Sequence, residues 1–156
     1  MFLRLKYSDM NNGLIAQAST SIYASVEKVW DALVNPEIIK QYMFGSEAIS
    51  EWKENSPIIW KGIWQGKTYE DHGFILKLDY GKTLVFSHFS PMTGLPDLLE
   101  NYHNVTFKLL GNGDFTHITL LQDNNSNEEE RKHSQSMWES MLSELKKVLE
   151  KDLKLT

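Results

Sequence analysis

Two short helices in direct succession are predicted by the stretch IYASVEKVWDALVNPE, residues 22–37. Ser25 has the short polar side chain that favours the N-cap of a helix, and apolar residues follow it at helical spacing. Asn35 and Pro36 then restart the chain, because asparagine caps a helix well and proline suits its first position. The stretch therefore predicts one helix over residues 26–34 and a second that runs to about Met43.

The sequence on both sides of this stretch alternates as strands do. Residues 14–23 predict a strand before the two helices, and a run of strands follows them, separated by glycine-rich turns. No alternation of strands and helices typical of a parallel sheet is present, so the sheet should be antiparallel. The strands expected after the helices cover residues 58–64, 68–78, 83–89, 102–110 and 116–122.

A long helix is predicted from about residue 127 to 152. Ser126 and Glu129 have the spacing of a capping box, and an apolar stripe follows at helical spacing. The expected fold class is α+β, in which a curved antiparallel sheet of about six or seven strands grips the C-terminal helix. The stripe consists of Ser134, Trp138, Met141, Leu142, Leu145, Val148 and Leu149.

Length and composition restrict the classes of function. A chain of 156 residues suits one domain, which we assign to residues 14–156 after an N-terminal arm of residues 1–13. The net charge of −5 and scattered basic residues argue against nucleic-acid binding. The absence of cysteine excludes disulfides, Cys-based zinc sites and thiol nucleophiles. No signal peptide or apolar run long enough to span a bilayer is present, so we expect a cytoplasmic protein.

Strand alternation places several large aromatic side chains on the face that the helix covers. An aromatic stripe of this kind fits either a solid core or a ligand cavity, and bulky rings at the ends of curved strands favour a cavity. We therefore predict a ligand-binding cavity between the sheet and the helix. Its expected walls are Trp60, Trp64, Phe74, Phe86 and His88 from the sheet, and Trp138, Met141, Leu142 and Leu145 from the helix.

The order of these elements resembles the START-like helix-grip fold, also called the Bet v 1-like or SRPBCC superfamily. Within it the sequence is most similar to the domain named after the activator of the Hsp90 ATPase. The resemblance covers about residues 14–152 and implies a fold shared by lipid and hydrophobic-ligand binders, polyketide cyclases and a co-chaperone domain. The segments that carry it are 22–33, 35–37, 73–75, 84–87, 104–109, 111–120 and 138–146.

Few residues are candidates for chemistry. His88 shares a strand face with Leu84 and Phe86, so it is either a general acid/base or polar anchor in the cavity, or a satisfied core histidine. The histidines lack metal-ligand spacing, and His103 and His117 could face each other on a hairpin. We predict no metal site and no cofactor.

Three functions remain open at this point. The first is a protein that binds a hydrophobic or aromatic small molecule without converting it. The second is a cyclase or dehydratase-type enzyme on the same cavity, with His88, Tyr42 or Tyr69 as candidate residues. The third is an interaction module in the manner of a co-chaperone domain. A homodimer through strand edges or the first helices is also compatible with the sequence.

Overall fold

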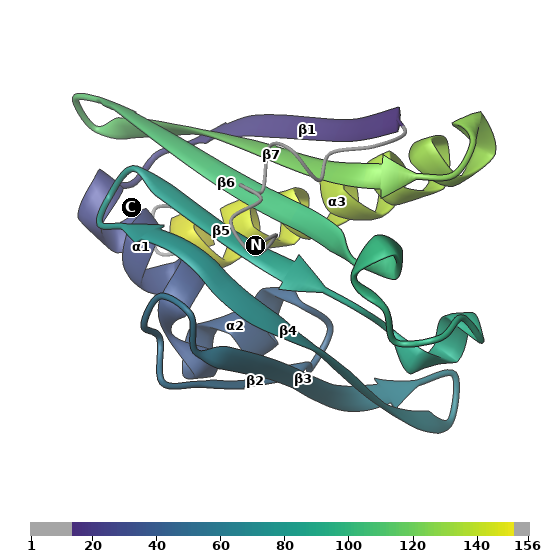
Figure 1. Ribbon diagram of the computed structural model, residues 1–156. Helices are drawn as coiled ribbons and strands as arrows, with labels where there is room; N and C mark the ends of the chain where they lie inside the picture. The colour runs from purple at the N-terminus through teal and green to yellow at the C-terminus, as the bar shows by residue number, and fades with distance from the viewer. Residues whose placement is uncertain (1–13, 152–156) are drawn as a thin grey trace.

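The computed structural model describes residues 14–151, which form a curved sheet of seven strands and three α-helices (Figure 1). The predicted N-terminal arm, residues 1–13, lies outside the described residues. The elements in chain order are β1 (Leu14–Ile22), α1 (Val26–Val34), α2 (Pro36–Tyr42), β2 (Glu47–Ser50), β3 (Pro57–Trp64), β4 (Lys67–Asp79), β5 (Thr83–His88), β6 (His103–Asn112), β7 (Phe115–Asn125) and α3 (Glu128–Glu150).

The sheet is antiparallel throughout, in the order β1-β7-β6-β5-β4-β3-β2. Its first strand therefore lies beside its last, and α3 crosses the concave face that this arrangement creates (Figure 1). The helix packs on β1 and β7 and against α2. The predicted α+β fold, with two short helices after the first strand, is confirmed.

The two short helices begin where their capping residues predict. Ser25 Oγ accepts a hydrogen bond from the Lys28 amide at 3.2 Å, and Asn35 Oδ1 accepts one from the Glu37 amide at 3.0 Å. Each cap satisfies an amide that has no partner within its helix. Pro36 follows the second cap at the first helical position, as its fixed φ favours.

Two details of the sequence prediction were wrong. The four-residue strand β2 was missed, because Glu47–Ser50 is too short to show a clear alternation, and it pairs with β3 at the sheet edge. The N-cap of α3 is Asn127 rather than Ser126. Asn127 Oδ1 accepts from the Glu130 amide at 2.8 Å, and the Glu130 carboxylate in turn accepts from the Ser126 amide. The capping box is thus displaced by one residue.

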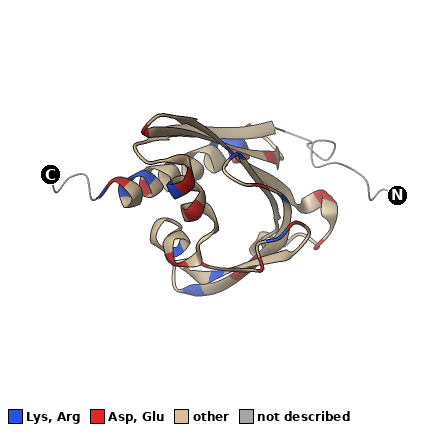
Figure 2. Cartoon of the chain, turned by 90° about the vertical axis from the view of Figure 1, so that its left-hand side faces the viewer, with Lys and Arg blue, Asp and Glu red and all other residues tan. Residues whose placement is uncertain are grey.

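Charged residues of both signs are interspersed along the helices and turns (Figure 2). The concave face of the sheet instead meets α3 through buried aliphatic side chains, among them Leu142 and Leu145, which are 1% and 0% exposed. Among the described residues, no helix is both long and apolar enough to cross a lipid bilayer.

Candidate functional site

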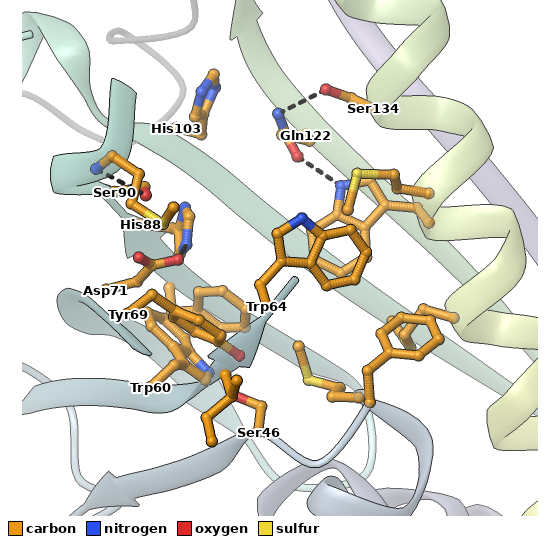
Figure 3. A pocket seen from close by; sticks show the side chains of 18 residues that line it. Ser46, Trp60, Trp64, Tyr69, Asp71, His88, Ser90, His103, Gln122 and Ser134 are labelled. Atoms are coloured by element: carbon orange, nitrogen blue, oxygen red, sulfur yellow. Dashed lines mark hydrogen bonds and ion pairs between the residues drawn. The ribbon is translucent and has the colours of Figure 1, made fainter. Parts of the chain in front are cut away.

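A cavity of about 360 Å³ lies between the N-terminal half of α3 and the open end of the sheet (Figure 3). It is formed by strands β3 to β7, by α3 and by the loops that follow α2 and β5. Its lining residues are Met43, Phe44, Ser46, Trp60, Ile63, Trp64, Tyr69, Asp71, Phe86, His88, Ser90, Met92, His103, Gln122, Ser134, Met137, Trp138 and Met141.

The floor of the cavity is a series of aromatic rings in contact. Trp60 packs on Phe86 with ring centroids 5.0 Å apart, and on His88 at 5.1 Å. Phe107 lies between Phe86 and Trp138 of α3, and its ring centroid is 6.0 Å from that of Phe86 and 6.4 Å from that of Trp138. These separations are those of favourable aromatic pairs, so the rings connect the sheet to α3 across the floor.

One wall carries ionisable side chains from three neighbouring strands. Tyr69 and Asp71 lie two residues apart on β4 and so share a face, His88 lies on β5, and His103 is its direct partner on β6. His88 Nε2 is 2.9 Å from Asp71 Oδ2, and Figure 3 shows the two side chains side by side. Because a carboxylate accepts hydrogen bonds, Nε2 carries a proton and Nδ1 is the nitrogen left for the cavity.

The position of this pair depends on a close approach of β4 and β5 at Gly73. A Cβ atom at Gly73 would lie 1.8 Å from the carbonyl oxygen of Ser87, the residue before His88. Only glycine allows the two strands to come together here, and this brings Asp71 beside His88.

The opposite wall is held by a polar network between β7 and α3. The indole Nε1 of Trp138 donates to Gln122 Oε1, and Gln122 Nε2 donates to Ser134 Oγ at 3.3 Å (Figure 3). Ser134 Oγ donates in turn to Asn125 Oδ1 at 2.9 Å. Since the buried polar groups are paired, the network orients Trp138 toward the cavity at little desolvation cost.

The mouth of the cavity is surrounded by exposed apolar side chains from separate elements: Phe44, Ile63, Trp64, Met92 and Met137. Met92 is carried by the loop after β5. Asp97 fastens this loop to the outer face of the sheet, accepting from Tyr102 Oη at 2.6 Å and from His72 Nε2 at 2.9 Å. The Tyr102 hydrogen bond and the adjacent His72 lower the pKa of Asp97.

Six of the nine predicted wall residues lie in the cavity wall: Trp60, Trp64, Phe86, His88, Trp138 and Met141. The other three lie elsewhere. Phe74 is 46% exposed on the outer face, because a bulge between Ile75 and Lys77 separates it from the inward Leu78. Leu142 and Leu145 are buried in the core: Leu142 directly follows the lining residue Met141, and Leu145 lies about one helical turn further along α3.

Two further expectations about chemistry were wrong. Tyr42 is 2% exposed and outside the cavity lining, and its hydroxyl donates to the Ala32 carbonyl at 2.7 Å. Burial raises the pKa of Tyr42, which makes it a structural hydrogen-bond donor. His117 does not face His103; it is 3.0 Å from Ser21 Oγ on β1. Within residues 14–151, no group of three or more His, Asp or Glu side chains is arranged to hold a metal ion.

A comparison with protein-family models matches residues 23–150 to "Activator of Hsp90 ATPase homolog 1-like protein". The chain belongs to this family.

Solved structures of other proteins share the fold of this chain. A protein from Cytophaga hutchinsonii, ChR145, is 55% identical, with a TM-score of 0.81 over 91% of this chain and 97% of its own. The Aha1 dimer from Colwellia psychrerythraea is 21% identical, with a TM-score of 0.71 over 88% of this chain and 97% of its own. DynU16, a protein in the dynemicin biosynthetic locus, is 16% identical, with a TM-score of 0.74 over 89% of this chain and 48% of its own. No protein of curated function matches.

Several residues that line the cavity were not predicted from the sequence. Asp71 was one of them, although its two-residue spacing from Tyr69 puts both side chains on one face of the strand. Gln122 continues the inward alternation of Ile118 and Leu120, so a polar residue at that point was a detectable signal. Met43 and Met92 carried no such signal, because they lie in connecting segments that have no strand or α-helical periodicity.

Proposed function

We propose that this chain binds a small, largely apolar molecule in the cavity between α3 and the sheet. The observation that carries the proposal is the cavity itself, whose volume of about 360 Å³ is lined mainly by aromatic and methionine side chains with a few convergent polar groups. Small-molecule sites in proteins have this character and range from roughly 300 to 1,000 Å³. An apolar cavity of about 150 Å³ holds one benzene ring, so a ligand of two rings suits this one.

The polar groups support a ligand that is bound in one orientation. They lie on the Asp71–His88 wall and on the Gln122–Ser134 wall, while the floor between them is made of rings. A ligand with an apolar body and a polar end satisfies both kinds of surface. Binding proteins commonly fix orientation through a small number of such groups.

The test is a fluorescence titration with a neutral aromatic probe, N-phenyl-1-naphthylamine. Trp60, Trp64 and Trp138 line the cavity, so we expect saturable quenching of tryptophan emission together with enhanced probe emission. Replacing Trp64→Ala should lower the affinity about three- to tenfold through loss of ring contact. Phe115→Ala is the matched control, because Phe115 is similarly exposed, at 48% against 51%, and lies outside the cavity lining. Non-saturable quenching, or equal loss in both variants, would contradict the proposal.

An enzyme of the cyclase or dehydratase type is the second candidate, favoured by the Asp71–His88 pair and by Tyr69 on the same wall. The similarity to DynU16 is one of fold and adds only that such a domain occurs in a biosynthetic locus. Product formation from a bound aromatic polyketide that is lost in His88→Gln and retained in His117→Gln would favour this second function over binding alone.

A further inference from the structure

The ionisable wall of the cavity has no fixed positive charge. Its titratable side chains are Tyr69, Asp71, His88 and His103, and no lysine or arginine occurs among the lining residues. A permanently anionic ligand would therefore meet the Asp71 carboxylate without a compensating cation. Positive charge can appear on this wall only through a proton taken up by a histidine.

His88 is arranged to take up that proton. Its Nε2–H is held by Asp71 at 2.9 Å, while Nδ1 has no hydrogen-bond partner among the described residues. The His88 side chain is 30% exposed and lines the cavity, so a ligand can reach it. A neutral imidazole with Nε2 protonated presents a lone pair at Nδ1.

Asp71 lies where it can pair with a positive charge that a ligand's proton would create on His88. Asp71 Oδ1 is buried without a partner, so the carboxylate lacks a second hydrogen bond, and a full positive charge on the adjacent ring would stabilise it. His103, directly across the strand pair, donates from Nδ1 to the Asp123 carbonyl at 2.8 Å. Burial and the neighbouring His88 both lower the pKa of His103. From α3, Glu130 adds a negative field at His103.

We propose that the cavity selects weakly acidic aromatic molecules, phenols or enols, and takes their proton on His88 Nδ1. The ligand O–H bond breaks and an N–H bond forms at Nδ1. The products are a bound oxyanion and an imidazolium whose Nε2–H remains bonded to Asp71. Asp71 is a positioning residue in this step, and the ligand itself supplies the proton that balances its charge. The inference rests on the proposed binding function and names the ligand class.

The test compares 4-nitro-1-naphthol with its methyl ether, which has no proton to give. The ionised naphthol absorbs at longer wavelength than the neutral form, so a pH titration of the bound dye measures its pKa. We expect the pKa of the bound naphthol to fall by about one to three units relative to the free dye, as an opposite charge at hydrogen-bonding distance produces. In His88→Gln the pKa of the bound naphthol should equal that of the free dye or exceed it, since apolar burial disfavours the anion.

Two further variants separate the proton step from folding. Asp71→Asn should remove at least half of the shift in the pKa of the dye, a readout that a purely structural role would not change. His72→Gln, on the outer face of the sheet, should leave the shift in the pKa of the dye unchanged. The methyl ether should bind His72→Gln as it binds the wild type, and it should still bind His88→Gln saturably, which shows that both variants are folded.

The outcomes distinguish the inference from the function on which it rests. If the ether binds but the bound naphthol titrates like the free dye, the proton transfer is wrong and the binding function stands. If neither compound binds saturably, both fail. A shifted pKa that persists in His88→Gln would also overturn the assignment of the proton to His88.

Discussion

The two halves of α3 meet the same sheet in different ways. The C-terminal half is close-packed: Met141, Leu142, Leu145 and Leu149 are all at most 7% exposed. Its end is fastened to β1, where Lys146 Nζ donates to the Ser21 carbonyl at 2.7 Å. The N-terminal half instead faces the cavity, with Met137 49% exposed and Trp138 held by hydrogen bonds.

The difference shows how one helix both stabilises the fold and leaves room for a ligand. Branched aliphatic side chains on the C-terminal half fill the space beneath them, which removes apolar surface from water and stabilises the fold. On the N-terminal half, Ser134 and Trp138 are hydrogen-bonded to Gln122 of β7. This part of α3 is therefore attached to the sheet by polar contacts beside the cavity rather than by a close-packed aliphatic core.

The largest effect should follow from weakening the packed half. Leu145→Ala removes the three carbon atoms beyond Cβ at a site that is 0% exposed, so it should lower the free energy of unfolding by about 2–5 kcal/mol. Urea denaturation followed by circular dichroism measures it. Leu110→Ala, at a leucine that is 69% exposed, should change stability by no more than about 0.5 kcal/mol. Equal losses in the two variants would mean that the C-terminal half is not the close-packed one.

A smaller effect is expected from the polar network of the cavity half. Gln122→Met keeps the approximate volume but leaves the Trp138 indole N–H without its acceptor and removes the amide that donates to Ser134. The free energy of unfolding should fall by about 1–3 kcal/mol, with a change in tryptophan emission. Gln41→Met, on the exposed face of α2, is the control and should change neither. An unaltered emission spectrum in Gln122→Met would show that the network does not orient Trp138.

The smallest effect concerns the buried carboxyl group of Asp123 on β7. Burial raises the pKa of Asp123 from 3.8 to about 6, so the folded state binds its proton more tightly than the unfolded state does. Its stabilising contribution is thus present at low pH and is lost as pH rises through the window from about 4 to 6. Asp123→Asn, which still accepts from the Asn104 amide, should raise stability by about 1 kcal/mol at neutral pH.

The pH dependence provides the check on this assignment. The advantage of Asp123→Asn over the wild type should shrink toward zero as urea denaturation is repeated at about pH 4. Asp114→Asn, in the exposed turn between β6 and β7, should show no such advantage. An advantage that stays constant across this range would mean that the Asp123 carboxyl does not titrate as burial requires.

Most of the fold was predictable from local signals, since caps and periodicity depend on neighbours in the chain. Ser25 and Asn35 cap their helices as their residue types indicate, and Trp60, Phe86 and Trp138 reach the cavity because alternation and helical spacing hold near them. Phe74 was misplaced because a bulge is set by the pairing of β4 with β5, which periodicity within one strand does not show.

The polar part of the site was harder to predict for the same reason. Asp71 and His88 are 17 residues apart in the chain, and their contact depends on the close approach of β4 and β5 at Gly73. The pairing of His88 with His103 follows from the register of β5 and β6. A long loop joins these two strands, and no short sequence pattern predicts the register across it. Contacts between strands thus decided which histidines face the cavity.

Most of the methionines of the chain line the cavity. Of the six methionines, Met1 and Met10 lie outside the described residues, and all four others, Met43, Met92, Met137 and Met141, line the cavity. Thioethers are flexible and polarisable, so this lining can adjust to ligands of different outline where leucine could not. With no cysteine to react first, peroxide would reach Met92 and Met137 at the mouth, which are 56% and 49% exposed. Conversion to sulfoxide would place polar, chiral groups around the entrance and lower the affinity of the cavity for an apolar ligand.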